Sequence, residues 1–368
     1  MTSRRYICWA FWAVLLALCS VLVLQSCRVE RPTPQAYSWD SVVSVAKTPG
    51  LYVGSPSLAI LPSGRYVASH DWFGPRTRYD TTVVFASDDQ GGTWRQIGAV
   101  AEQFWSGVFV HRGIPYLMGT NRAWGDVVIR RSEDGGRTWW RPGVILSGRR
   151  YHTAPVPILV HAGRFWRAFE VDIDNDPQPP DHFAAFVISA PLDANLLDPK
   201  SWQSTNLLQS QEDWREGNMV VAPNGELLNV LRTGRIPEMA AITHVSADGL
   251  RLSFDPAVDL VSMPGAGSKF TIRRKPGGGY LAIVNERRES GDYRNRLSLI
   301  GSEDLRSWRV LGELWHDADA EHNARQYVDW QICDGSLIYV SRTAADAANA
   351  HDANQMTFHQ VLLDDFRN

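Results

Sequence analysis

The stretch Ser87–Trp94 reads SDDQGGTW, and recognisable copies of it recur along the chain. It returns as SEDGGRTW at Ser132–Trp139 and as SEDLRSW at Ser302–Trp308, with a degraded copy, SADGLRLSF, at Ser246–Phe254. Asp and Ser side chains bond the backbone of tight turns, Gly supplies positive φ, and the final aromatic residue is a large apolar anchor. Each copy therefore predicts a hairpin turn, and the recurrence indicates a repeated fold.

A second pattern, an apolar run on either side of a Gly-containing turn, appears six times and is typical of a β-hairpin. The copies begin at Ser55, Ser106, His152, Glu216, Lys269 and Tyr327. Their spacing of roughly 50 to 60 residues suits blades of four short strands, so the sequence predicts an all-β fold, a six-bladed β-propeller with four antiparallel strands per blade. A strand starting near Ser38 is expected to close the ring beside the segment from Thr357.

The N-terminus is typical of an export signal. Two arginines precede an apolar run, and the ending Leu24-Gln25-Ser26-Cys27 resembles a bacterial lipobox. The predicted organisation is a lipoprotein-type signal at 1–26, a linker at 27–36 after a lipidated Cys27, and a single propeller domain at 37–368. An uncleaved anchor is the alternative, because the apolar run approaches the roughly 20 residues that span a bilayer. Either way we expect an exported, envelope-bound protein that contacts the membrane only through this anchor.

Charge and cysteine content exclude several classes of function. The whole chain has a net charge of −3, and no basic patch indicates a nucleic-acid partner. Cys333 is expected to be a small core residue, and no Cys or His cluster has metal-ligand spacing. We therefore expect a monomer without cofactor or catalytic metal. A structural calcium ion at the acidic loop of Asp172, Asp174 and Asp176 remains open beside the simpler interpretation of a solvated loop.

The turn boxes and six hairpins together resemble the bacterial sialidase (neuraminidase) superfamily over nearly the whole mature chain. Three segments carry the resemblance. The hairpin Glu216–Arg232 is similar to the family segment in which a Glu opens an inner strand and an Arg ends the next one. Arg294 stands eight residues before a box Ser, as in the family, and Tyr327 opens a strand that resembles the one carrying the family's catalytic Tyr.

The resemblance implies roles for these residues. Tyr327 would be the nucleophile and Glu216 its base, as in sialidases, which are an exception among retaining glycosidases in using a Tyr. Arg232 and Arg294 would bind a substrate carboxylate, which a guanidinium matches bidentately. Asp80, before the first box, would be the acid/base, with Asp71 or a His as its rival.

One departure from the family pattern concerns the substrate. The family's first arginine corresponds here to Gly54. Arg342, Arg122 or Lys269 is a candidate to supply the missing charge from a neighbouring blade. The repeat register also predicts that His70, His152 and Trp105 face the central funnel, where they would suit contacts to a different sugar. A glycan is thus the expected partner.

Three functions fit this pattern. The first is a sialidase-like exo-glycoside hydrolase that removes a terminal acidic sugar, sialic acid or a relative. The second is a uronic-acid polysaccharide lyase, in which Tyr327 or a His abstracts a proton beside an Arg-neutralised carboxylate. The third is a glycan-binding surface lipoprotein without turnover, because a shared fold does not fix function.

Overall fold

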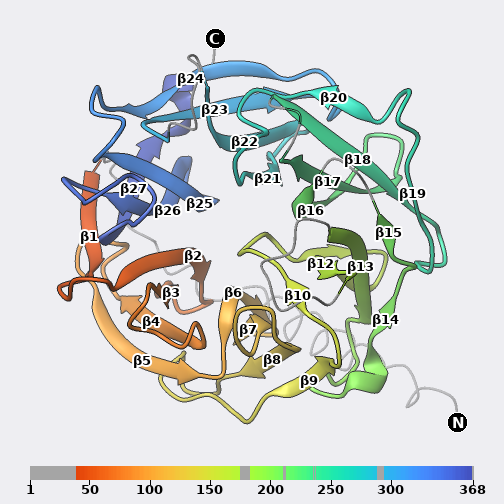
Figure 1. Cartoon of the computed structure of the whole chain (residues 1–368), viewed down its shortest axis with the longest axis horizontal. Coiled ribbons are helices and arrows are strands. Elements are labelled where there is room, and N and C mark those ends of the chain that lie inside the picture. Colours follow the sequence, from red (N-terminus) through yellow and green to blue (C-terminus); the bar gives the residue numbers. More distant parts are fainter. Residues whose placement is uncertain are drawn as a thin grey trace, which may run out of the picture. The chain divides into compact units, whose positions relative to one another are not determined.

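The structure, a computed structural model, describes residues 39–174, 183–209, 213–234, 236, 238–287 and 294–366. The export signal, Cys27 and the linker lie outside these ranges, so their assignments stay predictions. The described strands form six antiparallel sheets arranged around a central axis (Figure 1), which confirms the predicted six-bladed β-propeller. Within the same ranges, no helix is long and apolar enough to cross a membrane.

Each blade runs from an inner strand at the axis to an outer strand at the rim. Blade 1 contains β2 (Tyr52–Ile60), β3 (Tyr66–Phe73), β4 (Thr81–Ser87) and β5 (Arg95–Ala101). Blade 2 contains β6 (Phe104–His111), β7 (Ile114–Thr120), β8 (Val127–Arg131) and β9 (Gly143–Leu146). Blade 3 contains β10 (Tyr151–His152), β11 (Leu159–His161), β12 (Arg164–Asp172), β13 (Phe183–Pro191), β14 (Gln203–Ser204) and β15 (Leu208–Gln209).

The other three blades complete the ring. Blade 4 contains β16 (Trp214–Val221), β17 (Leu227–Thr233), β18 (Met239–Val245), β19 (Leu252–Ser253) and β20 (Leu260–Ser262). Blade 5 contains β21 (Thr271–Arg274), β22 (Tyr280–Asn285), β23 (Arg296–Ser302) and β24 (Arg309–His316). Blade 6 contains β25 (Ala324–Cys333), β26 (Ser336–Ala344), β27 (Gln355–Leu362) and β1 (Trp39–Val45). Two short 3₁₀ turns lie outside the strands, at Pro199–Ser201 and at Leu363–Phe366. Val42 pairs with Thr357, which confirms the predicted closure by the N-terminal strand.

The boxes form the turns between the third and fourth strands of their blades. In the first box, the amide of Gly91 donates to Ser87 Oγ at 2.7 Å and that of Thr93 to Asp89 Oδ1 at 2.9 Å. Trp94 Nε1 then donates to the carbonyl of Gly91 at 3.1 Å. The box therefore satisfies its own turn and folds its Trp back against the blade, as the sequence predicts.

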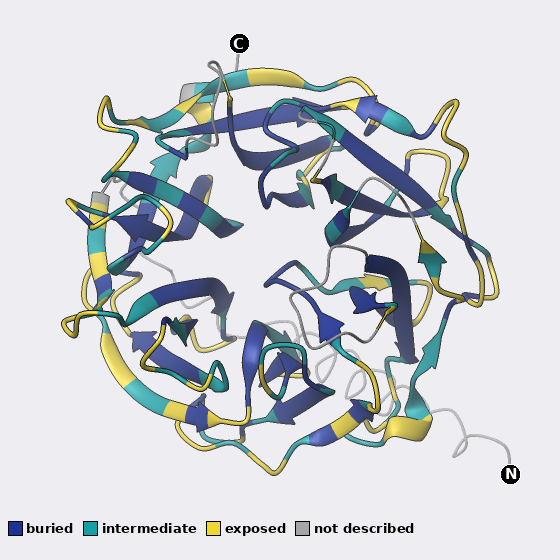
Figure 2. Ribbon diagram, in the orientation of Figure 1, coloured by how far each residue is buried: buried dark blue, intermediate teal, exposed yellow. Residues whose placement is uncertain are grey.

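The apolar core is divided among the contacts between neighbouring blades. A cluster between blades 1 and 2 contains Ala59 and Leu117, and one between blades 5 and 6 contains Leu281 and Trp330. Figure 2 shows most of the inner-strand residues as buried, whereas the rim strands β5 and β24 carry many exposed residues. Burial of apolar area drives this packing, so each blade depends on both of its neighbours.

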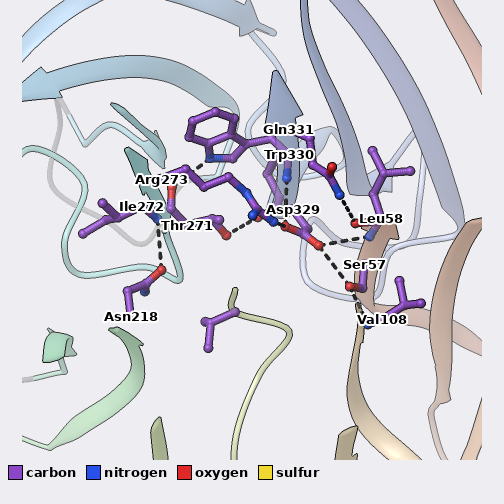
Figure 3. Close-up of polar contacts among 12 residues, drawn as sticks. Ser57, Leu58, Val108, Asn218, Thr271, Ile272, Arg273, Asp329, Trp330 and Gln331 are labelled. Atoms are coloured by element: carbon purple, nitrogen blue, oxygen red, sulfur yellow. Dashed lines mark hydrogen bonds and ion pairs between the residues drawn. The ribbon is translucent and has the colours of Figure 1, made fainter. Parts of the chain in front are cut away.

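Polar side chains bridge adjacent blades close to the axis (Figure 3). Asp329 Oδ2 accepts the amide of Leu58 in the next blade at 3.0 Å. Asn218 Oδ1 accepts the amide of Ile272 at 2.9 Å, and Ser57 Oγ accepts that of Val108 at 3.0 Å.

We call these three contacts the interblade clamps. Each clamp residue is almost fully buried and lies in the middle of an inner strand. Because a buried backbone amide without a partner is costly, each clamp fixes the position of one inner strand against the next.

We predict that Asn218→Ala lowers the free energy of unfolding by about 1–3 kcal/mol, because it leaves the buried Ile272 amide without its acceptor. Urea unfolding measures this change. Asn224→Ala, in an exposed hairpin turn, is the matched control and should cost less. Equal losses in the two variants would contradict the assigned role of the clamp.

Candidate active site

The candidate site is built where the first hairpin of each blade meets the axis. In this hairpin the start of the inner strand pairs with the end of the second strand. This register pairs Gly54 with Asp71, Phe104 with Thr120, His152 with Glu170, Arg215 with Arg232, and Gln326 with Arg342. The repeat therefore delivers residues to one end of the central axis in pairs, one pair from each of these blades.

Four inner strands share a backbone irregularity beside these pairs. Each has a shifted register and a residue with positive φ, namely Ser55 (53°), Trp105 (49°), Glu216 (58°) and Tyr327 (54°). Such bulges redirect a side chain out of the strand, and the left-handed conformation is costly for residues other than Gly. Strain of this kind is typical of functional positions, and two of the four are the predicted catalytic couple.

The structure brings Tyr327, Glu216 and Arg232 together. Arg232 Nη1 lies 3.1 Å from Glu216 Oε2, and the phenol of Tyr327 is close enough to both side chains to shift their pKa values. Burial alone would raise the pKa of Glu216, but the charge of Arg232, nearby His152 and the hydrogen bonds from Arg232 and Tyr327 lower it below its ordinary value. Glu216 is therefore an ionised acceptor beside a phenol.

Arg294 and Arg342 flank the same tyrosine. Their guanidinium carbons lie 5.4 and 5.5 Å from the centre of the Tyr327 ring. Burial lowers the pKa of Arg342 to about 10, and the neighbouring charge of Arg294 adds to this effect. Gln326 accepts a hydrogen bond from Arg294, while the carbonyl of His351 accepts one from Arg342. Three guanidinium groups thus surround one phenol and one carboxylate.

Gly54, where the resemblance expects an arginine, faces an aromatic wall. A Cβ atom added to Gly54 would stand 2.2 Å from Cε2 of Phe73, so the Phe73 ring fills the space of a side chain. Phe73 packs on Phe104 with ring centroids 4.7 Å apart, and the Arg342 guanidinium lies 5.6 Å from the Phe73 ring. In place of a further charge, blade 1 presents an apolar surface.

His152 lies in a group of aromatic rings on blades 2 and 3. Its centroid is 4.6 Å from Trp105, 5.3 Å from Trp124 and 5.3 Å from Phe183. Nδ1 of His152 is 2.9 Å from Glu170 Oε2. The charge of His152 also lowers the pKa of Glu216, which links this aromatic group electrostatically to the carboxyl beside Tyr327.

Asp71 is enclosed by donors from blades 1 and 2. The oxygens of its carboxyl group accept hydrogen bonds from Thr82 Oγ1 at 2.5 Å and from the Trp105 amide at 2.7 Å. Complete burial raises the pKa of Asp71 to about 8. The hydrogen bonds from Thr82, from Ser55 and from the Trp105 and Ser106 amides lower this pKa, but burial has the larger effect. These contacts hold the bulges at Ser55 and Trp105 in place, so Asp71 has a supporting role in the site.

His70 and Asp80 are not brought into the central group. His70 is fully buried, stacks on Phe85 at 5.4 Å, and has Nε2 2.9 Å from Ser44 Oγ. It therefore faces a neighbouring strand and not the funnel. Asp80 precedes β4 and accepts a hydrogen bond from Thr81 Oγ1 at 3.0 Å.

Arg122 and Lys269 also occupy other positions. Arg122 is exposed in the β7–β8 loop, where its carbonyl accepts the Gly125 amide. Lys269 is buried, and its Nζ donates to Thr271 Oγ1 and to the carbonyl of Val328, both at 2.6 Å. Burial lowers the pKa of Lys269 to about 8. Lys269 therefore supports the strand that carries Tyr327.

The described ranges contain no group of three or more His, Cys, Asp and Glu placed to hold a metal ion. Asp172 forms an ion pair with Arg150 at 3.0 Å, while Asp176 of the acidic loop lies outside those ranges.

Sequence reasoning missed Glu170, Trp124 and Gln326. Glu170 ends the hairpin that His152 opens, so the register of that hairpin was the signal that could have found it. Gln326 directly precedes Tyr327 and carries no charge, so no charge pattern in the sequence indicates it. Trp124 stands in a loop, where the repeat gives no register.

Comparison with known proteins shows likeness in fold. No protein-family model matches the chain, and no curated protein matches its sequence. The structure is similar to a Hadza microbial sialidase, Hz136, with a TM-score of 0.63 and 16% identity over 86% of this chain and 66% of that one. It is similar to an α-L-arabinanase of Penicillium chrysogenum complexed with arabinobiose, with a TM-score of 0.58 and 15% identity over 91% and 100% of the two chains.

A Trypanosoma rangeli sialidase matches with a TM-score of 0.59 and 14% identity over 89% of this chain and 60% of that one. The chain thus spans less than two thirds of the length of both sialidases. At these identities the likeness concerns architecture. The protein has the six-bladed propeller fold that these sialidases and the arabinanase, all glycoside hydrolases, also have.

We predict that Gly54→Ala lowers the free energy of unfolding by about 1–3 kcal/mol, because the new methyl group overlaps the Phe73 ring. Most of this cost should disappear in a Phe73→Ala background, where the ring is absent. A denaturant-unfolding double-mutant cycle measures the coupling. The same cost in both backgrounds would show that Phe73 does not fill this space.

Proposed function

We propose that the protein is an exo-acting glycoside hydrolase that removes a terminal acidic sugar through a Tyr327 nucleophile. The observation that carries this proposal is the convergence of one phenol, one ionised carboxylate and three guanidinium groups. Tyr327 lies beside the ion pair of Glu216 and Arg232, and the guanidinium carbons of Arg294 and Arg342 lie 5.4 and 5.5 Å from the centre of its ring. An expected lipid anchor at Cys27 would hold this activity at the cell envelope.

The arrangement suits attack by the phenol. As the Tyr327 oxygen approaches the anomeric carbon, its proton passes to Glu216, whose pKa is low enough to keep it ionised. Arg232 stabilises the negative charge that develops on the phenol oxygen. A neutral phenol also avoids the repulsion that a carboxylate nucleophile would meet from an acidic sugar.

The surroundings favour an anionic substrate of restricted shape. Arginine is suited to a carboxylate because its planar guanidinium binds two oxygens and stays charged. Arg294 and Arg342 supply such groups next to Tyr327. On the side of Gly54 and Phe73 the site offers an apolar ring instead. Sialic acid and other acidic sugars, such as glucuronic acid, are therefore the substrate classes to compare.

The first experiment offers residues 36–368 a fluorogenic sialoside, sialyllactose, nitrophenyl glucuronide and a glucuronic acid disaccharide. Arabinobiose serves as a neutral control. We expect release of an acidic sugar and no cleavage of arabinobiose, measured by fluorescence and by product mass. A product with a new ultraviolet-absorbing double bond would indicate a lyase instead. Saturable binding without product would indicate a glycan-binding protein.

Tyr327→Phe should reduce kcat on the cleaved acidic substrate by at least about a thousandfold, which corresponds to about 4 kcal/mol. The reason is that the variant keeps the ring and its arginine contacts but loses the attacking oxygen. Initial rates in the assay above measure the effect. Tyr116→Phe, a tyrosine stacked on Phe109 in blade 2, is the matched control. A loss below tenfold would overturn Tyr327 as the nucleophile.

A further inference from the structure

Within the glycosidase function proposed above, we propose that His152, held by Glu170, is the group that protonates the departing sugar. The proposal replaces Asp80 and Asp71 as candidates for this proton transfer, and it rests on the proposed function. It arises from the position of His152, its carboxylate partner and its aromatic surroundings.

His152 and Tyr327 stand on opposite sides of the ring. β10, which carries His152, belongs to blade 3, and β25, which carries Tyr327, belongs to blade 6 (Figure 1). Two blades lie between them on either side of the ring of six, so the two strands face one another across the axis. A retaining glycosidase needs its nucleophile and its acid to flank the scissile bond, and this arrangement supplies one group from each side.

Glu170 fixes the imidazole of His152. Its Oε2 lies 2.9 Å from His152 Nδ1, and its Oε1 accepts the amide of Gly217 at 3.2 Å. Glu170 is fully buried, so both of its oxygens are set by the fold. A carboxylate on one ring nitrogen sets the tautomer and the orientation of a histidine. Nε2, on the other edge of the ring, is then the nitrogen that exchanges a proton with substrate.

The charges around His152 link it to the nucleophile. Glu170 from β12 contacts it directly, and the charge of His152 also acts on Glu216 from β16, whose pKa it lowers. Tyr327 lowers the pKa of the same carboxyl, so Glu216 responds to both proposed reacting groups. Trp105 and Trp124 cover the imidazole at 4.6 and 5.3 Å and limit the access of water.

The two aspartates are placed less well. Asp71 is fully buried, and donors of blades 1 and 2 already occupy its oxygens. Asp80, which directly precedes β4, accepts a hydrogen bond from the neighbouring Thr81. The contacts of both aspartates lie within blades 1 and 2, whereas the charge of His152 acts on Glu216 and lowers its pKa.

The proton balance of both steps is complete. In the first step Tyr327 Oη bonds the anomeric carbon, its proton passes to Glu216, and His152 Nε2 gives a proton to the glycosidic oxygen as that bond breaks. In the second step the neutral imidazole takes a proton from water, whose oxygen bonds the anomeric carbon. The Tyr327 oxygen departs and recovers its proton from Glu216, which restores all three groups.

The test compares two leaving groups in the enzyme and its variants. A nitrophenolate departs without a proton, whereas a sugar alcohol needs one. We expect His152→Gln to lower kcat/KM about a hundredfold or more on sialyllactose or a glucuronic acid disaccharide, but less than tenfold on the matching nitrophenyl glycoside. Glu170→Gln alters the partner of the imidazole. It should lower the ratio of kcat/KM on the sugar leaving group to kcat/KM on the nitrophenyl leaving group as well, but by less than His152→Gln does.

His244→Gln is the matched control, because His244 pairs with Asp259 at 3.0 Å on β18 and should leave the ratio unchanged. Equal losses on both leaving groups in His152→Gln, or the selective loss appearing in Asp80→Asn instead, would overturn the assignment of His152. Activity of the unaltered enzyme on neither kind of substrate would overturn the proposed function, and this assignment with it.

Discussion

The structure depends on one arrangement that is repeated near the axis. An inner strand forms a bulge, and the side chain two residues later is an interblade clamp. Tyr327 is followed by Asp329 and Glu216 by Asn218, and each clamp residue holds a backbone amide of the next blade. The bulge turns the first side chain of each pair out of the strand, while the clamp holds the strand in place. Functional side chains are therefore positioned by rigid strands, which suits chemistry that requires accurate geometry.

The site has two sides of different character. Blades 4 to 6 contribute Glu216, Arg232, Arg294, Tyr327 and Arg342, whereas blades 1 to 3 contribute aromatic rings and the His152 and Glu170 pair. Burying several arginines is unfavourable unless each has partners, because charged groups lose hydration. Here the Glu216 carboxylate, the side-chain oxygen of Gln326 and backbone carbonyls supply those partners. An anionic substrate would add to them, which gives a physical reason to expect an acidic sugar.

The fold could be predicted from sequence because its signals are local and repeated. Each box contains the donors and acceptors of its own turn, and each hairpin shows its apolar runs on either side of a Gly. The meeting of Tyr327, Glu216 and Arg232 was implied by resemblance and agrees with the geometry. Its chemical role stays a proposal.

The rest of the site depends on register, which the sequence does not display. Asp71, Glu170, Arg232 and Arg342 occupy equivalent ends of second strands, opposite the starts of their inner strands. His70 lies one residue before this position, and neighbouring residues of a strand face opposite sides. It is therefore enclosed, and the prediction that it faces the funnel was wrong. Glu170 was missed for the same reason, since only its pairing with His152 shows its place.

The most direct test of the account is to trap the glycosyl-enzyme intermediate. Protein incubated with difluorosialic acid, or with the corresponding fluorinated glucuronosyl fluoride, is digested and its peptides are analysed by mass. The account predicts one added sugar on the peptide that contains Tyr327, and no addition in Tyr327→Phe. A sugar attached to Glu216 or Glu170, or turnover of an acidic glycoside without any label on Tyr327, would contradict it.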